Sequence, residues 1–308
     1  MEVCYYEKQE KSFKQYHLLQ QMTLALAACG GSSSDKESSS KDSSDKVYKD
    51  RYLPASLSMQ LLTRQPKDLK KPVKKKFGKD KVKFDLQNGQ GEQANCATIV
   101  NNFVADNDDL ILANATTALQ CAAAATSTIP ILGTSVTDYA TALDISDWTG
   151  STGMNISGTC DLAPIDEQEA MLKELLPDAK TVGILYCSAE PNSAYQAKKF
   201  EEALEKDGIK YKEYTAADSN EIQSVVTSAV DECDALYIPT DNTMASNTEI
   251  INNICLPAKV PVIAGEQGIC EGCGIATLSI SYYDIGYRAG EMAYDILVNG
   301  KRYLNHGY

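Results

Sequence analysis

The chain has 308 residues, more than one compact domain usually contains, so two lobes of about 100–150 residues each are expected. Its 42 acidic and 29 basic side chains give a net charge of −13, which argues against nucleic acid as a partner because phosphates attract basic surfaces. The two histidines, His17 and His306, lie outside the body of the chain, so none there can serve as a general base or metal ligand. We therefore expect no catalytic residue, no metal and no cofactor.

The first part of the chain contains a lipidation signal. Leu26-Ala27-Ala28-Cys29 fits the bacterial lipobox, in which cleavage occurs before a cysteine that carries the lipid. Residues 1–28 would be the signal peptide, atypical because residues 1–21 are rich in glutamate and glutamine. Residues 29–46 would be the lipidated Cys29 and a serine-rich tether. The alternative is an alanine-rich helix end capped by glycine. The lipobox predicts a protein anchored by lipid on the extracytoplasmic face of the cell membrane.

From about residue 82 the chain alternates short apolar runs with amphipathic stretches, the pattern of parallel α/β units. The first series predicts strands at 82–86, 110–113 and 130–133, and helices at 92–105 and 116–126. The second predicts helices at 166–176, 193–207, 219–231, 243–254 and 283–298, and strands at 182–186, 210–214, 235–239, 260–264 and 275–280. Two such series indicate two lobes and not one extended sheet.

The ten cysteines are scattered, and the one close pair is Cys270 and Cys273. A zinc ribbon would need a second pair of this kind. We therefore expect cysteines that are reduced or that staple loops. A redox or metal role for the close pair is the alternative.

Polar clusters follow the predicted strands. They lie at residues 114–117, 134–138, 188–190, 240–242 and 265–266. In open α/β sheets, ligands bind beyond the carboxyl ends of the strands, where helix N-termini offer free N–H groups. A single cluster could equally be a set of helix N-caps. Five clusters divided between two lobes favour a shared cleft.

The sequence resembles the ABC transporter substrate-binding family that includes binders of tryptophan and other aromatic amino acids. The likeness runs in order through about residues 77–300. It is carried by residues 84–91, 93–95, 103–106, 109–113, 134–138, 155–159, 174–186, 237–243 and 261–266, and by glycines and alanines from Gly286 to Ala293.

The resemblance implies an α/β fold of the type I periplasmic-binding kind, with two doubly wound, Rossmann-like lobes joined by a hinge. By this analogy lobe 1 holds residues 47–161 and 266–300, and lobe 2 holds residues 162–265. The chain would cross the hinge near Thr159–Asp161, near Gly265, and normally once more towards its end.

The family pattern breaks at residues 1–21, within 47–76, and at 301–308. Residues 50–76 contain no apolar strand, and three prolines interrupt any helix there. The abrupt breaks are what small frame slips in the coding sequence would produce. We therefore expect lobe 1 to lack a central strand and to be destabilised.

The resemblance also implies roles for individual residues toward a bound amino acid. Helix N–H groups with Thr116, Thr117 and Ser193 suit its carboxylate. Its ammonium needs an acid; the candidate acids and neutral partners are Thr137, Asp138, Glu190, Asp241 and Asn242, and the predicted site also includes Asp161 and Glu266. Tyr139 or Tyr186 would form an aromatic wall, with ordinary packing as the alternative. The family often has proline at positions 117 and 139 and serine at position 160, which leaves the ligand's identity open.

The function implied is that of an extracytoplasmic solute-binding lipoprotein, expected to be a monomer. It would capture a small ligand, an aromatic amino acid, and deliver it to an ABC permease and its ATPase subunits without catalysing a reaction. The alternative is a ligand-sensing receptor of the same fold that is not coupled to transport.

Overall fold

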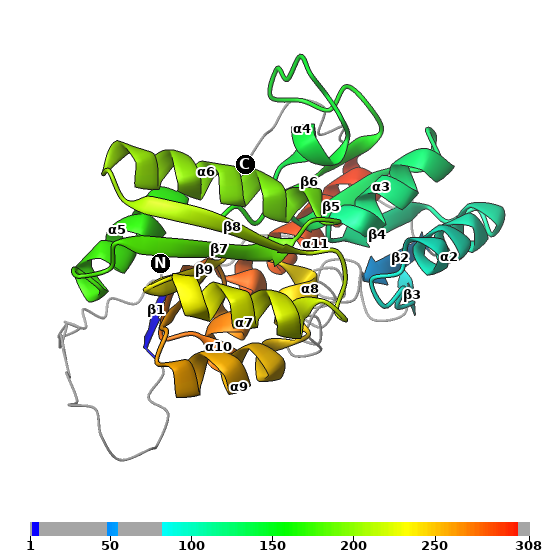
Figure 1. The fold of residues 1–308 in the computed structure, drawn as a ribbon. Helices are drawn as coiled ribbons and strands as arrows, with labels where there is room; N and C mark the ends of the chain where they lie inside the picture. The colour runs from blue at the N-terminus through cyan, green and yellow to red at the C-terminus, as the bar shows by residue number, and fades with distance from the viewer. Residues whose placement is uncertain (1, 6–47, 55–81, 301–308) are drawn as a thin grey trace, which may run out of the picture. The chain divides into compact units, whose positions relative to one another are not determined.

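The structure is a computed structural model that describes residues 2–5, 48–54 and 82–300. The described strands form two sheets (Figure 1). One has five parallel strands in the order β3-β2-β4-β5-β6. The other has six strands in the order β1-β11-β10-β9-β7-β8, in which β1 pairs antiparallel to β11 and the other neighbours are parallel.

The five-stranded sheet is built from the earlier part of the chain and one late helix. Its strands are β2 (Tyr48–Pro54), β3 (Val82–Leu86), β4 (Leu110–Asn114), β5 (Ile131–Val136) and β6 (Ile156–Cys160). The helices are α2 (Gln93–Ala105), α3 (Thr116–Ala125), α4 (Tyr139–Ala142) and α11 (Tyr282–Asn299).

The six-stranded sheet takes its parallel strands from the later part of the chain. Its strands are β1 (Glu2–Tyr5), β7 (Thr181–Cys187), β8 (Lys210–Ala216), β9 (Ala235–Ile238), β10 (Val262–Ala264) and β11 (Ala276–Ser279). The helices are α5 (Ile165–Leu175), α6 (Pro191–Lys206), α7 (Ile222–Glu232), α8 (Asn242–Ala245), α9 (Thr248–Ala258) and α10 (Gln267–Cys273).

Strand β4 shows why the buried strands of these sheets have continuous apolar sequences. All five of its residues are buried. Ile111 belongs to the apolar cluster with α2 and α3, whereas Leu110 and Leu112 belong to the cluster with α11. Successive side chains point to opposite faces of a strand, and here both faces are covered, so every position is apolar.

In the core of the six-stranded sheet, Gln168 forms a buried hydrogen-bond network. The rings of Phe200 and Tyr237 stack with centroids 3.6 Å apart. The Tyr237 hydroxyl donates to Oε1 of Gln168 over 2.8 Å, and Nε2 of Gln168 donates to the carbonyls of Gly265 and Leu278. One glutamine on α5 therefore fixes the ends of β10 and β11.

The expectation that lobe 1 lacks a central strand was wrong. Strand β2 lies between β3 and β4, and Asp50 pairs with Phe84 on one side and with Leu110 on the other. The expectation relied on finding an apolar run, but a backbone ladder can form along residues of any polarity. Residues 1, 6–47, 55–81 and 301–308 lie outside the described residues, so the leader, tether and frame-slip predictions that fall there stay predictions.

The chain also returns to the five-stranded sheet later than expected. Strand β11 pairs in parallel with β10, so β10, α10 and β11 all belong to the six-stranded sheet. The chain returns to the five-stranded sheet through Ile280 and Ser281. Residues 266–300 were predicted to belong to lobe 1, and within that range it is α11 that packs on β5 and β6. Gly265 serves another purpose: a Cβ there would lie 2.7 Å from the carbonyl carbon of Pro239, so the glycine permits close approach of the strand ends.

Both sheets have the same order for their parallel strands. The first strand of each series lies inside the sheet, with β2 between β3 and β4 and β7 between β8 and β9. The strand order therefore reverses at β2/β4 and at β7/β9. Ligands of open α/β sheets bind outside the carboxyl ends of the strands at such a switch point. Among the described residues, no helix has both the length and the apolar character that crossing a membrane requires.

Candidate functional site

The turn between β4 and α3 has a strained backbone. Ala115, the N-cap of α3, has φ 79° and ψ 162°, a region that is essentially restricted to glycine. Its N–H donates to the carbonyl of Thr134 at the end of β5 over 2.9 Å. Such strain persists only where the surrounding structure enforces it, and it concentrates at binding sites. The outlier marks this turn as a candidate for function.

The same turn presents polar groups that lack partners. No side chain caps the N-terminus of α3, where Thr116 is buried and Thr117 half-buried. Asn114, at the end of β4, is fully buried, and neither Oδ1 nor Nδ2 of its carboxamide has a hydrogen-bond partner. A buried amide without partners costs free energy. The turn can therefore accept a carboxylate at the helix N-terminus and a further hydrogen bond at Asn114.

Asp138 lies at the next strand end, after β5. It is half-buried and caps α4, because its Oδ1 accepts a hydrogen bond of 2.7 Å from the N–H of Thr141. Asp138 is thus a helix cap, as the alternative interpretation of the polar clusters expected. A hydrogen bond from Gln120 on α3 to the carbonyl of Ala142 on α4 ties the capped helix to α3.

Asp161 directly follows β6 and is buried. Its Oδ2 accepts a hydrogen bond of 3.3 Å from the hydroxyl of Tyr282, whereas its Oδ1 has no hydrogen-bond partner. Burial raises the pKa of Asp161 to about 6, and hydrogen bonds with Thr137 and Tyr282 limit the rise. A buried carboxylate with one unpaired oxygen is suited to a cationic ligand group.

Glu266 is buried at the N-terminus of α10. Both of its carboxylate oxygens accept backbone hydrogen bonds, from the N–H groups of Gly268 and Ile269. Burial raises its pKa to about 7, and the charges of Glu271 and Asp161 add to the rise. Both carboxylate oxygens of Glu266 therefore serve as the cap of its own helix.

In the six-stranded sheet, Asp241 ties two strand ends together. Its Oδ2 accepts a hydrogen bond of 2.7 Å from the N–H of Cys187, and its Oδ1 accepts one of 2.7 Å from the N–H of Met244. Burial, followed by the charge of Glu190, raises the pKa of Asp241. Both oxygens are engaged by the chain itself, which favours a positioning role over the predicted role as the ammonium partner.

Glu190 is engaged in the same way. Its Oε2 accepts from the backbone and side-chain N–H groups of Asn242, over 3.0 and 2.7 Å, and its Oε1 accepts from the N–H and hydroxyl of Thr243, over 2.8 and 2.7 Å. The carboxylate thus holds the start of α8 against the loop after β7. Asn242 serves this contact, which again favours positioning for both residues.

Ser193 lies fully buried in a network around the carbonyl of Thr240. Asn192 and Gln196 donate to that carbonyl over 3.3 and 3.1 Å, and the Ser193 hydroxyl lies 3.5 Å from it. The hydroxyl of Thr240 is buried and meets no partner at hydrogen-bond distance and angle, although its interaction with Tyr282 opposes the rise in the pKa of Tyr282 that burial causes. Ser193 therefore supports the strand end, and the unpaired group is the neighbouring Thr240, which sequence reasoning did not single out.

The two predicted aromatic walls have packing roles. The hydroxyl of Tyr139 donates to the carbonyl of Thr159 over 3.1 Å, and its ring packs so closely on Gly133 and Gly158 that a Cβ on either would clash. Tyr186 is buried among residues of the core that contains Phe200 and donates to Glu213 over 2.7 Å. The packing alternative fits both contacts.

Tyr195 is an aromatic residue that the sequence analysis missed. It is half-buried on α6, and α6 is in contact with α4 of the other sheet. Burial raises its pKa, and the charges of Asp138 and Cys160 raise it further. The sequence feature that could have identified Tyr195 is its position in the second turn of the helix that follows β7.

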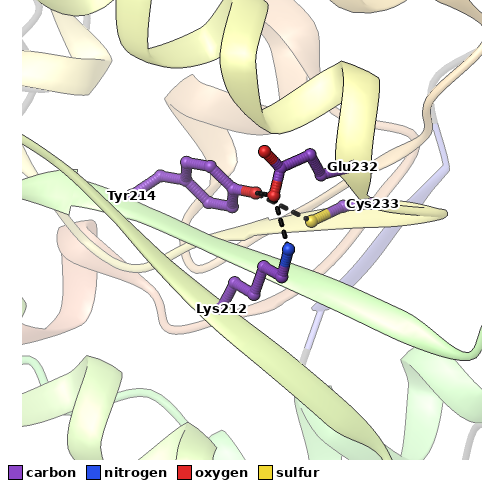
Figure 2. A network of polar contacts seen from close by, with 4 residues as sticks. All are labelled: Lys212, Tyr214, Glu232 and Cys233. Atoms are coloured by element: carbon purple, nitrogen blue, oxygen red, sulfur yellow. Dashed lines mark hydrogen bonds and ion pairs between the residues drawn. The ribbon is translucent and has the colours of Figure 1, made fainter.

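A second cluster of titratable groups lies away from these strand ends. Figure 2 shows Glu232 bonded to Lys212 and to Tyr214, whose hydroxyl receives a contact from the thiol of Cys233. The cluster ties the edge strand β8 to the end of α7. An exposed ion pair of this kind contributes little free energy, so its role is local.

A cavity of about 330 Å³ runs along α2, lined by Gln87, Ile99, Asn102, Phe103, Ala105 and Asp106, and none of the predicted binding residues lines it. Within the described part of the chain, no group of three or more His, Cys, Asp or Glu side chains is arranged to hold a metal ion.

Comparison with known proteins gives one family. Residues 62–303 match the family described as ABC transporter substrate binding protein. The chain is 35% identical over 218 residues to a tyrosine-binding protein of Clostridioides difficile (strain R20291), an alignment that covers 71% of this chain and 63% of the relative. The chain thus spans less than two thirds of that relative's length.

Solved structures agree in fold. An ABC domain in complex with L-Trp from Streptococcus pneumonia superposes with a TM-score of 0.79 at 30% identity, covering 84% of this chain and 87% of the other. A conserved domain protein from Vibrio cholerae gives 0.78 at 31% identity, covering 83% and 86%. A ligand-free, open substrate binding protein with adhesive properties from Clostridium difficile gives 0.61 at 35% identity, also covering 83% and 86%.

These likenesses confirm the predicted α/β fold of the type I periplasmic-binding kind. Together with the match over residues 62–303, they show that the chain belongs to the ABC transporter substrate binding protein family.

Proposed function

We propose that the protein binds a single free amino acid at the carboxyl ends of its two sheets, and that the amino acid is aromatic. The observation that carries this proposal is a set of three buried side chains with unpaired polar atoms: Asn114, Asp161 and Thr240. Asn114 ends β4, Asp161 follows β6 and Thr240 lies after β9, so both sheets contribute. Unpaired buried groups cost about 1–3 kcal/mol each, and a polar ligand would relieve that cost.

The ligand's carboxylate is assigned to the N-terminus of α3. The N–H groups of its first turn, the hydroxyls of Thr116 and Thr117, and the amide of Asn114 supply donors there. The positive end of the helix dipole adds to the attraction.

The ligand's ammonium is assigned to Asp161, with Asp138 as a second acid. Asp161 has an oxygen with no protein donor, whereas both oxygens of Glu190 and of Asp241 already accept bonds from the chain. An ammonium buried without a partner costs several kcal/mol, so the acid with a free oxygen is the favoured one.

An aromatic side chain on the ligand is supported by the relatives and by one residue of this chain. One relative is a tyrosine-binding protein, and one similar structure holds L-Trp. Tyr195 is half-buried on α6, which contacts α4, and offers a ring against which the ligand's own ring can stack.

The proposal extends to transport. The protein would deliver its ligand to an ABC permease and ATPase without catalysing a reaction, as a monomer held on the extracytoplasmic face by a lipid on Cys29. Family membership supports the transport role, and the lipobox sequence supports the anchor.

Isothermal titration calorimetry with matched ligands tests the binding proposal. L-Tyrosine, L-tryptophan and L-phenylalanine should bind, and L-aspartate should not. Tyramine lacks the carboxylate and 3-(4-hydroxyphenyl)propionate lacks the ammonium, so each should bind at least about 30-fold more weakly than tyrosine. Equal binding of tyrosine and both analogues would contradict recognition of a free amino acid.

A further inference from the structure

The thiols of Cys96 and Cys121 meet between two helices of the five-stranded lobe. Cys96 lies in the first turn of α2 and Cys121 in the middle of α3. The Cys121 Sγ lies 3.7 Å from the carbonyl oxygen of Gln93, one turn before Cys96, and each of the two thiols shifts the pKa of the other. Both residues are buried in one apolar cluster.

The backbone around Cys96 leaves room for its sulfur. A Cβ on Gly89 would lie 2.3 Å from the Cys96 Sγ, so a larger residue could not stand there without displacing the thiol. Glycine at this position thus lets the sulfur lie in the gap before α2.

The electrostatics of the pair are those of two interacting thiols. The hydrogen bond with Cys121 raises the pKa of Cys96, and burial raises it further, whereas the hydrogen bond with Cys96 lowers the pKa of Cys121. A thiolate at Cys121 that accepts the S–H of Cys96 explains both directions. The thiolate is the form that attacks a disulfide.

Other cysteines of the described residues have different contacts. Cys160 and Cys187 donate to backbone carbonyls, and Cys233 contacts the Tyr214 hydroxyl. Cys270 and Cys273 lie on one short helix, and the Cys273 thiol donates to the carbonyl of Ile269. The Cys96 and Cys121 pair lies on two different helices, α2 and α3.

We propose that Cys96 and Cys121 are a disulfide site, oxidised as the chain folds outside the cytoplasm. The Cys121 thiolate attacks a small-molecule or protein disulfide, which releases one thiol. The Cys96 thiolate then displaces the second thiol from the mixed disulfide, and the Cys96–Cys121 bond forms. Two thiol protons and two electrons leave the protein, and the oxidant is reduced from one disulfide to two thiols.

The bond would matter for the proposed binding site because α3 carries Thr116 and Thr117 at its start. A link to α2 fixes α3 against its neighbour and closes a loop from residue 96 to residue 121, which restricts the unfolded chain. The oxidising environment rests on the proposed extracytoplasmic location. The chemistry of the pair does not depend on it, nor on which ligand binds.

The test is oxidative refolding of the full chain. Protein unfolded and reduced in denaturant is refolded with oxidised and reduced glutathione, alkylated, and digested without reduction. We expect the intact protein, before alkylation, to have a mass about 2 Da below that of the reduced protein. After digestion we expect a peptide pair joining Cys96 to Cys121, and the midpoint of thermal unfolding should lie about 5–10 °C above that of the reduced protein.

Variants make the result specific. Cys121→Ala should abolish both the mass loss and the thermal shift, and Cys233→Ser should keep both. Absence of the joined peptide in oxidised wild-type protein, or cross-links that involve other cysteines instead, would overturn the proposal. Wild-type peptide mapping decides even if a variant fails to fold. Because the mapping needs no ligand, its failure leaves the proposed amino acid site standing, and a failure of tyrosine binding leaves the disulfide site standing.

Discussion

The hydroxyl of Tyr282 donates a hydrogen bond to Oδ2 of Asp161 over 3.3 Å and so joins the two described segments through which the chain passes between its sheets. Asp161 follows β6 on the way into the six-stranded sheet, and Tyr282 opens α11 on the way back. The carboxylate that offers an unpaired oxygen is therefore fixed at both crossings. A cation bound there would contact the hinge directly, which is how ligand binding could act on lobe movement.

Replacing Asp161 with asparagine should weaken tyrosine binding by about 30-fold or more, the scale of removing one partner of a buried charge pair. The same change should leave the stability of the unliganded protein unchanged or raised at pH 8, because the buried charge is unfavourable there. Calorimetry and thermal unfolding measure the two effects.

The control for that variant is Asp234→Asn. Asp234 accepts hydrogen bonds from the N–H groups of Lys180 and Thr181 at the start of β7, away from the strand ends that form the site. It should lower stability and leave tyrosine affinity unchanged. If Asp161→Asn bound tyrosine as the wild type does, the ammonium would lie elsewhere.

Asn114→Leu should lower tyrosine affinity by about 10-fold or more and leave the unliganded protein as stable as before, because the amide has no partner to lose. The matched control is Asn155→Leu. Asn155 donates to the carbonyls of Thr126 and Ile129, over 3.2 and 2.6 Å, so its loss should reduce stability and spare binding. The reverse pattern, a destabilised Asn114 variant with normal affinity, would make Asn114 structural.

Asp241→Ala should destabilise the protein by about 2–4 kcal/mol, because it leaves the buried N–H groups of Cys187 and Met244 without their acceptor. Chemical denaturation measures this loss. Asp138→Ala, which removes the cap of one short helix, should cost about 1 kcal/mol. A stable Asp241→Ala protein that has lost tyrosine binding would restore Asp241 as the ligand's partner.

Tyrosine affinity should rise with pH and level off above about pH 7. Burial raises the pKa of Asp161 to about 6 and that of Glu266 to about 7, from ordinary values of about 4. A raised folded-state pKa means that these groups stabilise the unliganded protein fully below about pH 4, and that this contribution is lost as pH rises through 6 to 7.

Burial favours the neutral form of Asp161, whereas the ligand's ammonium favours the ionised form. Binding near pH 6 should therefore release a proton from Asp161. Calorimetry at pH 5 and pH 8, in buffers of different ionisation enthalpy, counts that proton. Asp161→Asn should flatten the dependence. A wild-type affinity equal at both pH values would argue against an ionised Asp161 in the complex.

Cys29→Ser should release the protein from the membrane fraction of the cells that produce it, because serine cannot carry the thioether-linked lipid. Fractionation and immunoblotting measure the distribution, with Cys160→Ser as the matched control that stays bound. Continued membrane association of the Cys29 variant would mean that the lipobox sequence is not used.

Much of the fold follows from periodicity, and the exceptions have identifiable causes. Strand β7 was predicted at 182–186 and spans Thr181–Cys187, because buried parallel strands are apolar throughout. The helix predicted at 243–254 is two helices, α8 and α9. The start of α8 is held by its N-cap Asp241 and by Glu190, which is distant in the sequence. The break comes at Asn247, whose side chain donates to the carbonyl of Thr243. Strand β2, α4, β6 and α10 were not predicted, because none is a long apolar or amphipathic run.

The location of the site could be predicted from the sequence, but the role of each residue in it could not. The polar residues do gather at strand ends of both sheets, as the strand-end rule predicts. Whether a carboxylate caps a helix or meets a ligand depends on N–H groups far away in sequence, such as that of Cys187 against Asp241. The sequence also gave no sign that Asn114 and Thr240 would be among the buried groups left without partners.

The late position of α11 in the chain sets an order of assembly during translation. Its residues Ala289, Met292 and Ala293 cover the face formed by Leu110, Leu112 and Leu132, which were synthesised more than 150 residues earlier. Strands β7 to β11 and their helices form one uninterrupted stretch that can complete its parallel sheet first. The five-stranded sheet, although synthesised earlier, keeps one apolar face exposed until α11 leaves the ribosome. A chaperone would be needed most during this interval.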